Sequence, residues 1–315
     1  MVRIPDAEQT PRGPAFEGRL LDRPDEEVVD QGAPFDVRTL ITRRGILGLV
    51  GVGLGTAALA ACAPMSSAGT TSTATPTSSA SAAPGSASGT LPSGEISDET
   101  AGPYPGDGSN GPDVLEQSGI VRSDLRTSIG SSTAVEGVPL TFTLRVTDMA
   151  NGDAPFAGVA VYAWHCDALG RYSMYSEGVE NETWLRGVQV SDANGQVTFT
   201  SVVPGCYTGR WPHIHFEVYP SADGITDSGN AIATSQLALP EAPLTDVYAL
   251  SAYDGSARNL SQVTLSSDNI FGDDGGALQV ATVTGDTTSG YTAALAVRVD
   301  TTTTPSAGQA PGGRR

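Results

Sequence analysis

Two of the three histidines in the chain, His213 and His215, lie two residues apart in a segment rich in apolar residues. Side chains two residues apart on a β-strand face the same side, so a strand here would present both imidazoles to one point. Imidazole nitrogen is a common ligand of transition metals. The pair therefore indicates a metal site, with two hydrogen-bonded surface histidines as the alternative interpretation.

Tyrosines are the best candidates for the remaining ligands. His165 has no cysteine pair or carboxylate pattern near it that would complete a zinc site. Tyr172 follows it, and Tyr207 lies six residues before His213. A phenolate is a hard, anionic oxygen donor, and two phenolates with two imidazoles suit Fe(III). Metal binding lowers the pKa of a bound phenol, so ionising it needs no separate base.

This ordered set resembles the intradiol ring-cleaving catechol dioxygenases, a family that includes protocatechuate 3,4-dioxygenase. Tyr172, Tyr207 and the histidine pair occur in the family's order, with Arg210 three residues before the first histidine. The resemblance runs from about residue 99 to residue 248, and it is greatest to the secreted branch of the family. It includes residues 99–104, 121–124, 160–172, 185–189, 204–218 and 235–240.

The resemblance implies a non-haem Fe(III) centre. Tyr172 would be the equatorial phenolate and Tyr207 the axial one, which the substrate displaces. His213 would be the axial imidazole and His215 the equatorial one. The reaction implied is the insertion of both atoms of O2 into a catechol-type ring, with cleavage between the two hydroxylated carbons to a cis,cis-muconate-type product.

Four further residues receive roles from the same resemblance. Arg210 would face the substrate, where a fixed guanidinium stabilises negative charge developing on the ring; a surface ion pair is the alternative. Gln236 would lie near the oxygen site. Tyr104 and Trp211 would contribute to the substrate pocket, although ordinary packing explains Tyr104 equally well.

The N-terminal region has the features of an export signal. Arg43 and Arg44 precede an uncharged stretch of small and apolar residues, 45–61, which is short for a membrane helix. The stretch ends at Cys62 in a sequence that resembles a bacterial lipoprotein box. We therefore expect a twin-arginine lipoprotein signal over residues 1–61 and acylation of Cys62. The protein would then be extracytoplasmic, anchored by lipid to the outer face of the cytoplasmic membrane or secreted.

Acylation of Cys62 would leave two cysteines, Cys166 and Cys206, in an exported protein. An even number permits one disulfide, which would join the two segments that carry the tyrosines. Two free buried thiols are the alternative. His165, next to Cys166, is interpreted as a structural residue rather than a ligand.

The elements that position these residues have the pattern of strands. Residues 62–94 are almost entirely Ala, Ser, Thr, Pro and Gly, which indicates a flexible linker, and residues 301–315 indicate a disordered tail. Residues 95–300 contain short runs rich in β-branched and aromatic residues, separated by turn residues. The sequence predicts an all-β sandwich of mostly antiparallel strands. The clearest runs are 140–146, 159–164, 196–200 and 293–299.

The charge of the chain limits its partners. It has 315 residues with 35 acidic and 17 basic side chains, all 17 of them arginine, for a net charge of −18. Such a chain cannot neutralise a run of phosphates, which excludes a nucleic-acid binder. The expected partners are a small aromatic diol, O2 and, through Cys62, a membrane. A catalytically silent cell-surface β-sandwich that binds aromatics or carbohydrate is the alternative function.

Overall fold

The computed structural model describes residues 8–10, 13–16, 19–20 and 91–305. The chain divides into two compact units, Met1–Ser86 and Ala87–Arg315. In the first unit, β1 (Glu8–Thr10), β2 (Gly13–Phe16) and β3 (Arg19–Leu20) pair antiparallel in that order. Apart from these strands, the predicted signal, Cys62 and most of the predicted linker lie outside the described residues, as do residues 306–315 of the tail.

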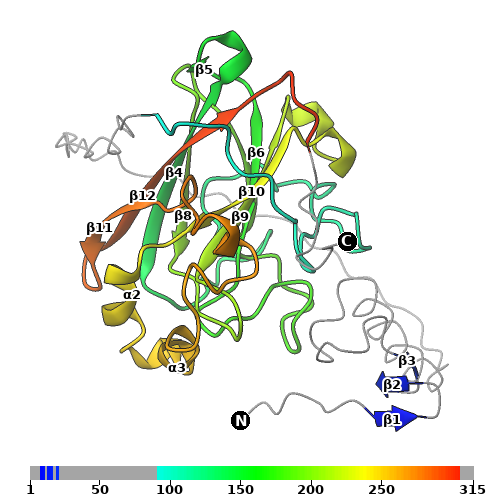
Figure 1. Cartoon of the computed structure of the whole chain (residues 1–315), viewed down its shortest axis with the longest axis vertical. Coiled ribbons are helices and arrows are strands. Elements are labelled where there is room, and N and C mark those ends of the chain that lie inside the picture. The colour runs from blue at the N-terminus through cyan, green and yellow to red at the C-terminus, as the bar shows by residue number, and fades with distance from the viewer. Residues whose placement is uncertain (1–7, 11–12, 17–18, 21–90, 306–315) are drawn as a thin grey trace, which may run out of the picture. The chain divides into compact units, whose positions relative to one another are not determined.

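The second unit contains two β-sheets (Figure 1). The first has the order β10-β9-β6-β7 and is antiparallel throughout. In the second, β12 pairs parallel with β4, while β11, β5 and β8 join antiparallel. The bounds are β4 (Pro139–Asp148), β5 (Ala154–Pro155), β6 (Ala160–Trp164), β7 (Arg186–Val190), β8 (Gln196–Val202), β9 (His213–Tyr219), β10 (Ala233–Ala238), β11 (Thr282–Asp286) and β12 (Gly290–Val299).

Helices are few and short. Figure 1 shows α2 (Glu241–Val247) and α3 (Ser256–Leu260) near each other, at one end of this unit. Within residues 91–305, no helix is long and apolar enough to cross a membrane. The remaining helical turns are 3-10 in type and cover Met149–Asn151, Ala222–Gly224, Ser228–Asn230, Ser251–Tyr253 and Phe271–Asp273.

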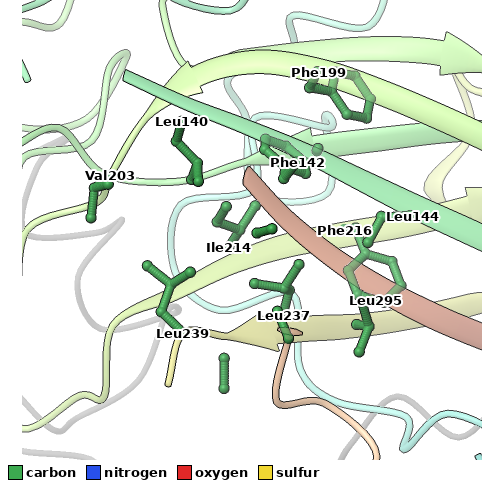
Figure 2. Packing of buried hydrophobic residues seen from close by; sticks show 14 of the residues in the cluster. Leu140, Phe142, Leu144, Phe199, Val203, Ile214, Phe216, Leu237, Leu239 and Leu295 are labelled. Carbon is green, nitrogen blue, oxygen red and sulfur yellow. The ribbon is translucent and has the colours of Figure 1, made fainter. Parts of the chain in front are cut away.

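The main core lies between the two sheets. Alternate residues of each strand point into it because side chains of a strand alternate between its faces. Figure 2 shows Phe142 and Leu144 of β4 in one cluster with Ile214 and Phe216 of β9. The rings of Phe142 and Phe199 stack with their centroids 5.0 Å apart, joining β4 to β8. The predicted all-β sandwich of mostly antiparallel strands is confirmed.

The same alternation places the histidine pair on the opposite face of the four-stranded sheet. His213 and His215 point away from the core that Ile214 and Phe216 enter, yet all seven residues of β9 are buried. A second apolar cluster covers this outer face, with Tyr162 and Trp164 of β6 packed against Val114 and Leu115 from the preceding segment. The candidate ligands are therefore held inside the protein by loops laid over the sheet.

Candidate metal centre and active site

The four predicted ligands come together in space. The Nε2 atoms of His213 and His215 are 3.0 Å apart, and the hydroxyl oxygen of Tyr207 is 3.3 Å from Nε2 of His213. The hydroxyl oxygens of Tyr172 and Tyr207 are 3.5 Å apart. Two nitrogen and two oxygen donors thus converge from β9 and two separate loops.

A hydrogen bond orients the imidazole of His213, and ring stacking orients that of His215. Nδ1 of His213 lies within hydrogen-bond distance of the carbonyl oxygen of Trp211, which can only accept a hydrogen bond. Nδ1 of His213 must therefore carry the hydrogen, and Nε2 offers its lone pair to the site. Trp164 stacks on the His215 ring at 4.9 Å and 9°, which fixes the plane of that ring.

Burial dominates the protonation of all four side chains. It lowers the pKa of both histidines well below the ordinary value, so both are neutral imidazoles. It also raises the pKa of Tyr172 strongly and that of Tyr207 to about 12, with the Arg210 charge partly opposing the shift at Tyr207. Without a cation the phenols therefore stay protonated.

This donor set fits a metal ion. Two neutral imidazole nitrogens at 3.0 Å share at most one proton, and Nδ1 of His215 is buried without a hydrogen-bond partner. A cation between the Nε2 atoms would satisfy both lone pairs. Within the described part of the chain, no group of three or more His, Cys, Asp or Glu residues could hold a metal. The two tyrosines are therefore necessary to complete a site here.

Asp167 shapes the turn that presents Tyr172. Its Oδ1 accepts from the backbone N–H groups of Leu169 and Arg171, at 3.0 and 2.8 Å. Its Oδ2 accepts from the Arg171 guanidinium at 2.6 and 2.9 Å. The backbone N–H of Tyr172 then donates to the Ser176 hydroxyl at 2.9 Å. Local polar contacts therefore fix this segment immediately before the first phenol.

Two glycines let the tyrosine-bearing loops pack closely. A Cβ atom on Gly205 would lie 2.5 Å from the carbonyl oxygen of Ala168, and the Gly205 N–H donates to the carbonyl of Asp167 at 3.0 Å. Gly170 has a φ of +80°, and a Cβ there would lie 3.0 Å from Cβ of Tyr207. Larger residues at either position would push the two phenols apart.

Arg210 and Gln236, the two other predicted catalytic residues, contact each other. The Nη2 group of Arg210 donates to Oε1 of Gln236 at 2.6 Å, and Nε donates to Oδ2 of Asp268 at 3.0 Å. Gln236 is opposite His215 in the pairing of β10 with β9 and is fully buried. Arg210 is thus held beside the four donors by a neighbouring strand and by an acid far along the chain.

The two predicted pocket residues have different environments. The Tyr104 ring is partly buried, with its centroid 5.0 Å from that of Tyr172, so it lies beside the site. Trp211 instead belongs to the main core, and its indole N–H donates to the carbonyl of Leu239 at 2.7 Å. The expectation that Trp211 forms a pocket wall is corrected, because this bond draws the ring into the sandwich.

The cysteines and His165 are structural. Cys166 and Cys206 are free and buried, which is the alternative to the possible disulfide, and their thiols contact different carbonyl groups. Those carbonyls belong to Gly205 and Arg210 respectively, each at 3.5 Å. His165 lies between the Cys166 carbonyl and the Ser201 hydroxyl, 2.7 Å from each, as expected for a residue that is not a ligand.

Arg186 connects the segments around the site. Its side chain is fully buried, and its Nη2 group donates to the carbonyls of Tyr104 and Ser173 at 2.9 and 3.0 Å. Nη1 donates to the Pro105 carbonyl and the Tyr162 hydroxyl, and Nε to the Ser173 hydroxyl. All five N–H donors are used. The sequence analysis missed this role, as it missed Asp167 and Asp268.

Comparison with known proteins agrees with this geometry. A family model described as dioxygenase matches residues 110–215, which include all four candidate ligands. The solved dioxygenase Tetur07g02040 is 25% identical, with a TM-score of 0.50, over 62% of this chain and 92% of its own. These two matches identify residues 110–215 as a dioxygenase domain.

Two further solved structures of dioxygenases match with TM-scores below 0.5. An intradiol ring-cleavage dioxygenase from Tetranychus urticae is 26% identical, with a TM-score of 0.49, over 62% of this chain and 92% of its own. The dioxygenase domain of a carbohydrate-binding fusion protein from Streptomyces sp. SirexAA-E is 24% identical, with a TM-score of 0.43, over 66% and 99%. A comparison with curated proteins finds no match. The family model and the match to Tetur07g02040 support a dioxygenase enzyme, and its candidate site residues are the ones that converge in this structure.

Proposed function

We propose that this dioxygenase binds Fe(III) through Tyr172, Tyr207, His213 and His215 and cleaves a catechol between its hydroxylated carbons. The observation that supports this most is the convergence of the four donor atoms, linked by distances of 3.0, 3.3 and 3.5 Å. When bound, the iron would supply the Lewis acidity that holds both catechol oxygens and makes the ring reactive toward O2. Insertion of both oxygen atoms would give a cis,cis-muconate-type diacid.

The two tyrosines have different tasks in this proposal. Tyr172 is 2% exposed and packed between Tyr104 and His215, so it stays in place as a ligand. Tyr207 is only partly buried and can move away when the substrate arrives. Its pKa of about 12 as a free phenol makes the released phenolate a strong base for a catechol hydroxyl.

Arg210 stabilises charge on the substrate. Its guanidinium is partly buried beside the candidate ligands and Gln236, where an always-protonated group interacts strongly with a catechol dianion. Gln236 holds one guanidinium edge and is itself fixed by donating from Nε2 to the Thr100 carbonyl at 3.3 Å. The orientation of the arginine is therefore set before the substrate binds.

Visible absorption of iron-loaded protein tests the ligand set. A tyrosinate-to-iron band should form in the native protein and move to longer wavelength when catechol is added without oxygen. Tyr172→Phe and Tyr207→Phe should each weaken the band and lower the iron content. Tyr175→Phe is the matched control, because the Tyr175 hydroxyl is already bound to the Gly106 N–H at 2.8 Å. An unchanged band in both ligand variants would contradict the proposal.

We also propose that the enzyme is exported and lipid-anchored at Cys62. Support comes from the paired arginines, the uncharged stretch 45–61 and the cysteine that follows it. Cells grown with a labelled fatty acid should yield labelled native protein and unlabelled Cys62→Ser protein. Equal labelling of both, or none of either, would contradict lipidation at this residue.

A further inference from the structure

Asp268 is the one acid that contacts Arg210 among the described residues. It is 2% exposed and lies 58 residues beyond Arg210, outside the segment that the family model matches. Nothing in the mechanism proposed above uses it. A buried charge is costly unless it is paired and hydrogen-bonded, so its position needs an explanation.

The Asp268 carboxylate is held by four N–H donors. Oδ2 accepts from Nε of Arg210 at 3.0 Å and from the backbone N–H of Trp211 at 2.6 Å. Oδ1 accepts from the backbone N–H groups of Ile270 and Phe271, at 2.8 and 3.0 Å. Acceptance of four hydrogen bonds is the capacity of an ionised carboxylate. Asp268 therefore joins Arg210 to the start of β9 and to the loop that follows α3.

These contacts determine which edge of Arg210 faces the site. Nε is committed to Asp268, and one Nη2 bond goes to Gln236. Nη1 makes no hydrogen bond within residues 91–305. The charge of Arg210 acts on both phenols, Tyr207 and Tyr172. The free edge is therefore available to a ligand beside them, while the opposite edge is neutralised.

The other cations around the site are also engaged. Arg186 donates all five of its N–H groups to neutral protein groups, and Arg171 pairs with Asp167 at 2.6 Å. The chain contains no lysine. The only cation left for a carboxylate on the substrate ring would thus be Arg210, which is already paired with Asp268. The negative charge of Asp268 would repel that carboxylate.

We infer that Asp268 positions Arg210 and offsets its charge away from the free Nη1 edge. Arg210 thus serves the catechol oxygens that contact this edge, while the site selects an uncharged catechol over one that carries a ring carboxylate. The inference rests on the proposed function and extends it to the substrate class. A purely structural Asp268 would affect all catechols equally. A charge-cancelling Asp268 changes the ratio between neutral and anionic ones.

A matched pair of ligands measures that ratio. We would titrate the iron-loaded full chain, without oxygen, with 3,4-dihydroxybenzamide and with 3,4-dihydroxybenzoate, and follow the shift of the visible band. The two differ mainly in one negative charge. The native protein should bind the amide more tightly. Asp268→Asn should shift the ratio of dissociation constants toward the carboxylate by about tenfold. Removing one unit charge at roughly 7 Å has an effect of about this size when the effective dielectric constant is about 20 to 80.

Two variants serve as controls. Asp273→Asn removes one negative charge from an exposed position on the same loop, and solvent screening should keep its ratio within about twofold of native. Asp268→Glu keeps the charge but lengthens the side chain. It should retain the native ratio while lowering catechol turnover, because Arg210 is displaced.

The possible results distinguish the role of Asp268 from the proposed iron centre. An unchanged ratio in folded Asp268→Asn overturns the inference. If that variant does not fold, native protein that binds the carboxylate as tightly as the amide overturns it as well. No band and no shift with either ligand would instead overturn the proposed iron centre, which keeps the two failures distinguishable.

Discussion

Replacing Gly205 by alanine tests whether close packing of two loops assembles the metal centre. The added Cβ would lie 2.5 Å from the Ala168 carbonyl oxygen and 2.8 Å from its carbon, and both atoms belong to the backbone. No side-chain rotation can relieve this contact, so the loops must separate. Overpacking of this kind costs about 1 to 3 kcal/mol. The shift carries Tyr207, two residues on, away from Tyr172.

Urea unfolding and the visible iron band are the two assays. Gly205→Ala should lose about 1 to 3 kcal/mol of unfolding free energy and most of the tyrosinate band. Gly209→Ala in the same loop is the control. Its φ of +83° makes alanine cost about 1 kcal/mol, but its Cβ would have no neighbour within 4 Å. The band should therefore survive there. A stable Gly205→Ala protein with a full band would refute the packing argument.

Two further variants probe buried polar groups near the site. Arg186→Met removes the guanidinium donors to the carbonyls of Tyr104, Pro105 and Ser173, of which Pro105 keeps the Tyr162 hydroxyl as a donor. The unfolding free energy should fall by about 3 kcal/mol or more, and a loss below about 1 kcal/mol would contradict this. Burial raises the pKa of Glu99 from 4.5 to about 7, so the folded state binds this proton more tightly and stability falls as pH rises between these values. The unfolding free energy of Glu99→Gln should therefore equal that of the native protein at pH 4 and exceed it by about 2 to 3 kcal/mol at pH 8. If urea unfolding instead gave parallel pH profiles for the two proteins, Glu99 would not be the cause.

Local patterns in the sequence were sufficient for the sandwich and for the candidate ligands. The two-residue spacing of His213 and His215 specifies one face of a strand, and β9 places both imidazoles there. The predicted run 140–146 lies within β4, and 293–299 lies within β12. The parallel pairing of these two strands was not predictable, because it joins segments about 150 residues apart.

Residues that depend on distant partners escaped the sequence analysis. In the sequence, Asp268 is one of 35 acidic residues, and only folding brings its carboxylate to Arg210. Arg186 begins a strand, and its burial follows from carbonyls more than 80 residues earlier in the chain. Trp211 next to Arg210 suggested a pocket wall, but the acceptor that fixes its indole comes from Leu239. Proximity in sequence was a poor guide at all three positions.

The most direct test of the central claim is the mass of the product formed from catechol under ¹⁸O2. Iron-loaded protein should convert catechol to cis,cis-muconate that carries ¹⁸O from both atoms of O2, and His215→Ala should abolish the conversion. A product from cleavage beside, rather than between, the hydroxylated carbons would contradict the proposed reaction. Equal conversion by His215→Ala would contradict the proposed site.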